Sequence, residues 1–263
     1  MIPGMQIRIT DTELSDISKW FDEFTENYYG HDETVNKNLG IKQDHTSRVC
    51  IEILSIGIQL GLSGEELRLA ELIALLHDVG RFEQFARYRT FSDSKSENHA
   101  LLGLKIIIEN RILENLDTEV KEIVFKSIEY HNHASLPADE SEHILFYSRL
   151  LRDADKLDIY KVVTDYYLGS DKNGSLIMDL PDKPGISEKV FEDIKSRNIV
   201  NIDHINNIND FKLLQAAWVF DINFRATMDR IRERKYLEKI RSVLPDTEET
   251  EELFEILGRQ VSG

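Results

Sequence analysis

A chain of 263 residues can bury a substantial core, either as one large domain or as one domain with a helical appendage. Its 48 acidic residues outnumber its 32 basic residues, and a net charge of −16 excludes a broad surface for duplex nucleic acid or for an anionic membrane. Cys50 is the only cysteine, so an internal disulfide is excluded and a reducing compartment is expected. The sequence has no signal-peptide pattern and no apolar run near the ~20 residues that span a bilayer, which predicts a cytoplasmic protein with no membrane partner.

Apolar residues recur with helical spacing in almost every periodic segment, and strand-like alternation is almost absent. Ser63 followed by Glu66 is a capping-box signature, which predicts that a helix begins there. Residues 81–97 interrupt the pattern with aromatic, arginine and small polar residues, and this composition favours a loop or a short lid. The helices predicted before position 169 are, in order, 13–29, 42–60, 63–80, 98–115, 118–133 and 142–168.

Glycine and proline residues gather in residues 169–186, which predicts a linker or loop. An irregular, asparagine-rich segment separates the first two of the helices that follow, which are predicted at about 187–197, 210–234 and 247–257. The sequence therefore predicts an all-α protein. It would have a helical-bundle domain over residues 1–168, which includes the N-terminal helix, and a C-terminal helical extension over residues 187–263 that packs on it.

Four of the histidines and two of the aspartates between positions 45 and 155 form one candidate set, drawn from five predicted helices. Residues three, four and seven apart share a helix face, and this rule places five of them on the apolar side of their helices. A single inward histidine is more often a hydrogen-bonded core residue than a ligand, whereas a buried aspartate needs a cation or several donors. The combination predicts a metal site, with these candidate ligands: His45, His77, Asp78, His99, His131 and Asp155.

Asp78 follows His77 at the end of a predicted helix, beside Gly80. At a helix end, two adjacent side chains can address two neighbouring ions, and a carboxylate with two oxygens is suited to bridge them. Metal pairs of this kind lie ~3.5–4 Å apart and stabilise both the attacking and the leaving oxygen of a displacement. We therefore expect Asp78 to be the bridging ligand.

The order of these residues resembles the HD domain of metal-dependent phosphohydrolases. The resemblance covers roughly residues 40–165 and includes His45, the His77-Asp78 pair and the final motif Asp153-Ala-Asp-Lys-Leu-Asp158. The additional histidines, in Glu97-Asn-His-Ala100 and Glu129-Tyr-His-Asn132, resemble the subset of HD proteins that bind two metal ions. The resemblance implies one ion held by His45, His77, Asp78 and Asp155. It implies a second ion held by His99 and His131, with Asp78 bridging.

Two basic residues adjoin the expected ligands and are candidates to stabilise charge on a phosphoryl group. Arg81 lies three residues after Asp78, and Lys156 follows Asp155. The predicted catalytic residues are accordingly Asp78, Arg81 and Lys156. Aromatic and arginine residues of the 81–97 segment are candidates to contact a base or phosphate, although its phenylalanines equally fit a role in pinning the segment to the core.

The expected function is hydrolysis of a phosphoester or pyrophosphate bond in a small molecule, with a nucleotide as the expected substrate, by attack of metal-bound hydroxide. The cofactors would be two divalent ions, drawn from Mn, Fe, Co, Ni or Mg. Two alternatives use the same residues: a di-iron oxygenase of the same superfamily, and a non-catalytic module that senses a nucleotide. The sequence pattern makes no prediction about the oligomeric state.

Overall fold

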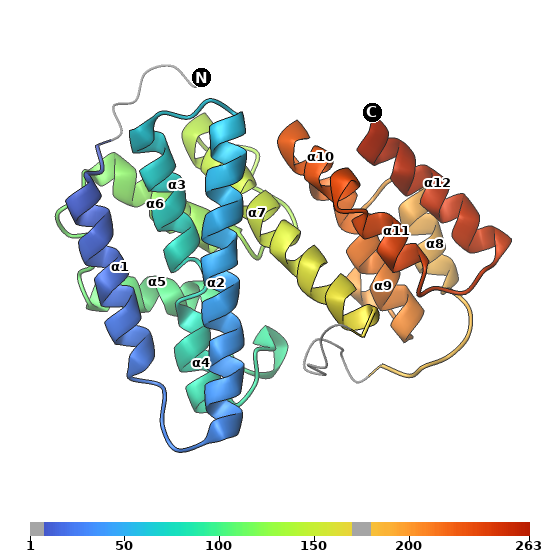
Figure 1. Ribbon diagram of the computed structural model, residues 1–263, viewed down its shortest axis with the longest axis horizontal. Coiled ribbons are helices and arrows are strands. Elements are labelled where there is room, and N and C mark those ends of the chain that lie inside the picture. The colour runs from blue at the N-terminus through green and yellow to red at the C-terminus, as the bar shows by residue number, and fades with distance from the viewer. Residues whose placement is uncertain (1–7, 170–179) are drawn as a thin grey trace. The chain divides into compact units, whose positions relative to one another are not determined.

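The computed structural model describes residues 8–169 and 180–263 of the chain (Figure 1). Every regular element within those two ranges is a helix, so the predicted all-α class is confirmed. Residues 170–179, at the centre of the predicted 169–186 linker, lie outside the described part of the chain.

The chain divides into two compact units, Met1–Asp155 and Lys156–Gly263. The division falls inside a long helix, α7 (Glu142–Tyr167), whose first part belongs to the first unit. The predicted domain bounds, with the first domain extending to residue 168, stay a prediction.

Helix α3 forms the centre of the first unit, where it contacts α1, α2 and α6. The side chains of Leu69, Leu72 and Ile73 are fully buried, because a helix enclosed on several sides must be apolar around most of its circumference. The elements of this unit are α1 (Asp11–Glu26), α2 (Glu33–Gln59), α3 (Gly64–Leu76), α4 (Gly80–Tyr88), η1 (Asp93–Lys95), α5 (His99–Glu109), α6 (Thr118–Tyr130) and the first part of α7.

The start of α3 matches its sequence signal, whereas the start of α2 does not. Ser63 and Glu66 form the predicted capping box, in which the Glu66 carboxylate accepts a hydrogen bond from the Ser63 backbone at 2.7 Å. Helix α2 begins at Glu33 rather than near residue 42, because Asp32 caps it by accepting hydrogen bonds from two backbone N–H groups. The added turns bury Val35 and contain several polar residues that hide the helical pattern.

Residues 81–97 are not a loop throughout, and that prediction was wrong for their first half. Residues 80–88 form α4, because Phe82 and Phe85 lie on one helix face and are both buried. The helix ends at Arg89, whose φ of 57° is left-handed. The remainder of the segment contains the short helix η1 and leads into α5.

The second unit contains the end of α7 and the helices that follow it. The predicted helix 210–234 is broken, because η4 follows α9 and the backbone of Ile222 is extended. Tyr160 of α7 stacks on Tyr236 with ring centroids 5.5 Å apart, and its hydroxyl donates to the carbonyl of Ala216 at 3.3 Å. The remaining elements are α8 (Glu188–Lys195), η3 (Ile202–His204), α9 (Ile208–Ala217), η4 (Trp218–Asp221), α10 (Arg225–Glu233), α11 (Tyr236–Arg241) and α12 (Glu248–Ser262).

None of the helices in the described ranges combines the length and the apolar character that crossing a bilayer requires.

Candidate metal centre

The six predicted ligands come together inside the first unit. His45 lies in the middle of α2, and His77 and Asp78 lie at the C-terminal end of α3. His99 is the first residue of α5, His131 lies at the C-terminal end of α6, and Asp155 lies in α7. Five of the side chains are buried, and that of Asp155 is 19% exposed. The residues concerned are His45, His77, Asp78, His99, His131 and Asp155.

A close contact between α4 and α5 brings Asp78 and His99 together. A Cβ atom on Gly80 would lie 2.2 Å from the carbonyl oxygen of His99 and 2.6 Å from the backbone nitrogen of Gly103. These distances are far below a normal contact, so only glycine permits this approach of the two backbones. The glycine after the His77-Asp78 pair therefore helps to build the site.

Three of the four histidines have a defined orientation. The Nδ1 atoms of His77 and His131 lie 2.7 Å from the carbonyl oxygens of Ala74 and Ile128, respectively. The Nδ1 atom of His99 lies 2.7 Å from Oδ2 of Asp93. Carbonyls and carboxylates only accept hydrogen bonds, so each Nδ1 carries the proton and each Nε2 presents a lone pair.

These lone pairs face one another in a buried space. The Nε2 atoms of His99 and His131 are only 2.9 Å apart, and Nε2 of His77 has no hydrogen-bond partner among the described residues. Two unshared lone pairs at hydrogen-bond distance repel unless a cation lies beside them, and a buried acceptor without a donor is costly. The donor arrangement therefore fits bound metal ions.

The two oxygens of the Asp78 carboxylate face two different pairs of histidines. Its Oδ2 lies 3.7 Å from His45 Nε2 and 3.8 Å from His77 Nε2, whereas its Oδ1 lies 3.4 Å from His99 Nε2 and 3.8 Å from His131 Nε2. We call His45, His77 and Asp78 the first cluster, and Asp78, His99 and His131 the second cluster. One carboxylate thus serves two potential metal positions, as predicted from its place beside His77.

Asp155 joins the first cluster, with Oδ1 3.2 Å from Nε2 of His45. Burial opposes ionisation of both aspartates of the centre, but neighbouring positive charge and hydrogen bonds outweigh it. The pKa of Asp78 is held well below its usual value by Lys42, with Arg81 acting in the same direction, and a hydrogen bond with His45 lowers the pKa of Asp155. Both carboxylates are therefore ionised at neutral pH, as metal ligands must be.

Burial also keeps two of the histidines neutral, His77 and His131. Desolvation lowers the pKa of His77, and it lowers the pKa of His131 to about 3, with the neighbouring His99 acting in the same direction. A neutral imidazole keeps its lone pair for a metal. The assignment of the six residues as ligands stays a prediction that this geometry supports.

Of the two basic residues predicted to contact substrate, one lies beside the shared carboxylate. Arg81 Nε is 3.4 Å from Asp78 Oδ1, and its Nη1 donates to the carbonyl of Phe91 and to Asp93 Oδ1, at 2.5 and 3.0 Å. Lys156 instead pairs with Asp221, with Nζ and Oδ2 2.6 Å apart. The catalytic roles of Arg81 and Lys156 stay predictions.

Sequence reasoning did not identify Lys42 as part of the site. Its Nζ lies 2.9 Å from Asp78 Oδ2, on the side of the first cluster, and 5.4 Å from the centre of the Phe91 ring. Lys42 precedes His45 by three residues and so shares its helix face, but a lysine in such a position is usually solvated. Its place three residues before His45, on the same face of the helix, was the sequence signal that could have identified Lys42.

Asp93 was also missed. Its Oδ1 accepts hydrogen bonds from Arg81 and from Gln84 Nε2, at 3.0 and 2.8 Å, and its Oδ2 accepts from His99 Nδ1. The Nδ2 atom of Asn132 lies 3.3 Å from the same Oδ2. Asp93 lies in the segment predicted to be a loop, where no periodicity indicates which side chains point inward.

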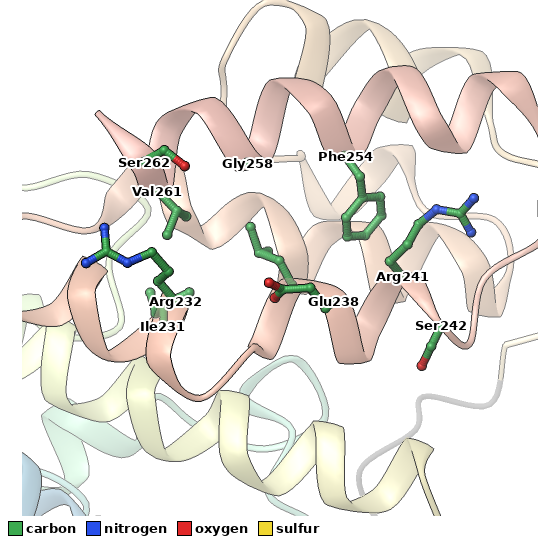
Figure 2. A pocket seen from close by; sticks show the side chains of 10 residues that line it. Ile231, Arg232, Glu238, Arg241, Ser242, Phe254, Gly258, Val261 and Ser262 are labelled. Atoms are coloured by element: carbon green, nitrogen blue, oxygen red, sulfur yellow. The ribbon is translucent and has the colours of Figure 1, made fainter.

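A separate cavity of about 400 Å³ lies in the second unit, between α10, α11 and α12 (Figure 2). Figure 2 shows Phe254 and Val261 pointing from α12 toward α10 and α11, with Arg232 and Arg241 toward opposite ends. Among the described residues, no histidine or aspartate lines this cavity, so it lacks the side chains that could form a metal site like that of the first unit. It shares no residue with the metal centre.

The fold and the site define an all-helical domain with two buried His/Asp clusters that share Asp78. The family model of the HD domain matches residues 43–160, which confirms the resemblance predicted from the motifs. HD domains bind divalent metals, and most proteins that carry one are metal-dependent phosphohydrolases. No curated protein and no solved structure matched the chain.

Proposed function

We propose that this protein is a phosphohydrolase that uses two divalent metal ions. The observation that carries the proposal is the set of facing Nε2 lone pairs, together with an Asp78 carboxylate divided between two clusters. The first ion would be held by His45, His77, Asp78 and Asp155, and the second by Asp78, His99 and His131. Bound ions of this kind lower the pKa of water and neutralise charge on phosphoryl oxygens.

The residues of the chain contribute positive charge beside the ions. Lys42 and Arg81 lie at the two oxygens of Asp78, 2.9 and 3.4 Å away. With metal bound at Asp78, the Lys42 ammonium would lose its ion-pair partner and would be available to a phosphoryl oxygen of the substrate. Arg81 is held by Phe91 and Asp93, so it acts as a fixed positive charge.

A small phosphorylated molecule, and a nucleotide in particular, is the proposed substrate. The local cations at Asp78 can attract one anionic group, whereas the net charge of −16 disfavours a long polyanion. Tyr88 at the end of α4 has a 44% exposed side chain and offers a ring for a base. Buried Phe85 stacks on the half-buried Phe91 with ring centroids 4.6 Å apart, which supports instead the pinning role for those phenylalanines.

The test is phosphate release from a panel of nucleotides by chelator-stripped protein that has been reloaded with Mn, Fe, Co, Ni or Mg. The assay is run under nitrogen and under air. We expect oxygen-independent release that is lost in His77→Ala and kept in His31→Ala, since His31 is exposed. Folding of both variants is checked by circular dichroism.

Two other outcomes would contradict the proposal. Oxygen uptake without phosphate release in the iron-loaded protein would assign it to the di-iron oxygenases, whose ligands are of the same types. Tight nucleotide binding without turnover in every metal would make it a sensing module.

A further inference from the structure

Asp93 orients a histidine of the metal centre through its side chain, whereas two other histidines of the centre are oriented by main-chain carbonyls. His77 and His131 are oriented by carbonyl groups of their own helices, three residues earlier in each case. His99 is the first residue of α5 and has no preceding helical turn, so its Nδ1 partner comes from elsewhere. That partner is the carboxylate of Asp93 in η1.

The contact fixes which nitrogen of His99 carries the proton. A carboxylate 2.7 Å from Nδ1 accepts the Nδ1–H hydrogen bond, so Nε2 is left as a lone pair directed toward Asp78 and His131.

The other oxygen of Asp93 is anchored by α4. Arg81 Nη1 and Gln84 Nε2 both donate to Oδ1, and Gln84 is fully buried. Gln84 also donates to the carbonyl of Glu97, at 2.9 Å, which holds the segment between η1 and α5. The carboxylate is therefore held firmly enough to set the direction of the His99 ring.

We propose that Asp93 is the positioning residue of the second cluster and that the affinity for the second metal ion depends on it, whereas the affinity for the first does not. The inference rests on the proposed two-metal function. Among the described residues, the side-chain hydrogen bonds of Asp93 are with Arg81, Gln84, His99 and Asn132, and none is with a ligand of the first cluster. Groups that orient a metal-bound histidine in this way typically change metal affinity ~10–100-fold when they are removed.

The test is calorimetric titration of Mn²⁺ into chelator-stripped wild type and Asp93→Asn. The wild type should bind two equivalents. The variant should bind the first with unchanged affinity and the second ~10–100-fold more weakly. Glu97→Gln is the matched control, because it removes the same charge from the same segment, where Glu97 pairs with Arg87 rather than with a histidine.

A second measurement needs no variant. Long-range ¹H–¹⁵N correlation spectra of metal-free wild type should show His99 protonated on Nδ1, and Asp93→Asn should populate the Nε2-protonated tautomer. A carboxylate that only supported the fold would change the melting temperature without changing the tautomer. The spectra therefore separate a positioning role from a structural one.

The possible results distinguish this inference from the function on which it rests. Wild type that binds fewer than two equivalents would contradict the proposed two-metal function. If the wild type binds two, the inference alone is overturned by a variant that keeps both equivalents at full affinity or loses both together. An Nε2-protonated His99 in the metal-free wild type would also overturn it.

Discussion

The two clusters of the metal centre share Asp78 but are held by different kinds of structure. In the first cluster, His45 lies in the middle of α2 and His77 at the end of α3, and a main-chain carbonyl orients His77. In the second cluster, His99 begins its helix and is oriented by a side chain from a short 3₁₀ element. The comparison indicates that the first metal position depends on the helical core, whereas the second depends on the local structure between α4 and α5.

Asp78→Asn should have the largest effect, because it removes the ligand common to both clusters. An amide has one acceptor oxygen in place of two, and it leaves Lys42 and Arg81 without their shared ionic partner. We expect metal-dependent activity to fall by ~10³-fold or more, since two-ion chemistry requires both positions. Metal analysis should find less than one equivalent per chain, and two retained equivalents would contradict the shared-ligand account.

Gly80→Ala should affect the second cluster more than the first. The added Cβ would meet the backbone of α5 at 2.2 Å, and backbone atoms have little room to move. We expect a loss of ~1–3 kcal/mol in the free energy of unfolding, as in other overpacked cores, and weaker binding of the second Mn²⁺ equivalent. Urea unfolding and calorimetric titration measure the two effects.

Gly258→Ala provides the control for that substitution. Gly258 lies within α12, and a Cβ there would meet nothing within 4 Å. Alanine should stabilise this helix by up to ~1 kcal/mol and leave metal binding unchanged. An equal loss of stability in both variants would show that the close approach at Gly80 is not responsible.

The metal-free protein should lose stability as the pH falls from 7 to 5. The pKa of His131 is about 3 in the folded chain and near 6.5 when unfolded, so the unfolded chain takes up the proton first and the free energy of unfolding declines. One histidine accounts for up to ~2 kcal/mol over this range, and the depressed pKa values of Asp78 and Asp155 add further losses only at lower pH.

Urea unfolding at pH 7 and pH 5, in the presence of chelator, measures this change. His131→Asn should reduce the pH dependence, whereas His31→Asn, at an exposed position, should not. An unchanged pH dependence in His131→Asn would show that burial does not keep this imidazole neutral.

Lys42→Met should produce the smallest change and should act on the first cluster. The ammonium is 2.9 Å from the oxygen that faces His45 and His77, so it competes with a cation for that position. We expect the first Mn²⁺ equivalent to bind several-fold more tightly, and inorganic phosphate to bind the loaded protein more weakly. Lys37→Met, exposed on the same helix, should change neither, and weaker Mn²⁺ binding in Lys42→Met would contradict this role.

Helical periodicity was sufficient to predict that the six candidate side chains point inward, because each lies on a helix or at its end. The phase of His45 or His131 follows from apolar neighbours three, four and seven residues away. The place of Asp78 in both clusters followed from its helix-end position beside Gly80.

The groups around the ligands could not be predicted in the same way. Lys42 lies on the predicted face but belongs to a residue type that is usually solvated. The position of Asp93 depends on tertiary contacts, and its segment has no periodic pattern of apolar residues. The helix before it, α4, was not predicted either. The break after α9 escaped prediction because the apolar spacing of 210–234 continues through it.

The most direct test of the central claim is Mn²⁺ titration of the chelator-stripped wild type, followed by electron paramagnetic resonance. Two ions that share the Asp78 carboxylate should lie ~3.5–4 Å apart and couple magnetically. The account predicts saturation at two equivalents, with a spin-coupled signal that appears as the second equivalent binds. Saturation at one equivalent, or two uncoupled ions, would contradict it.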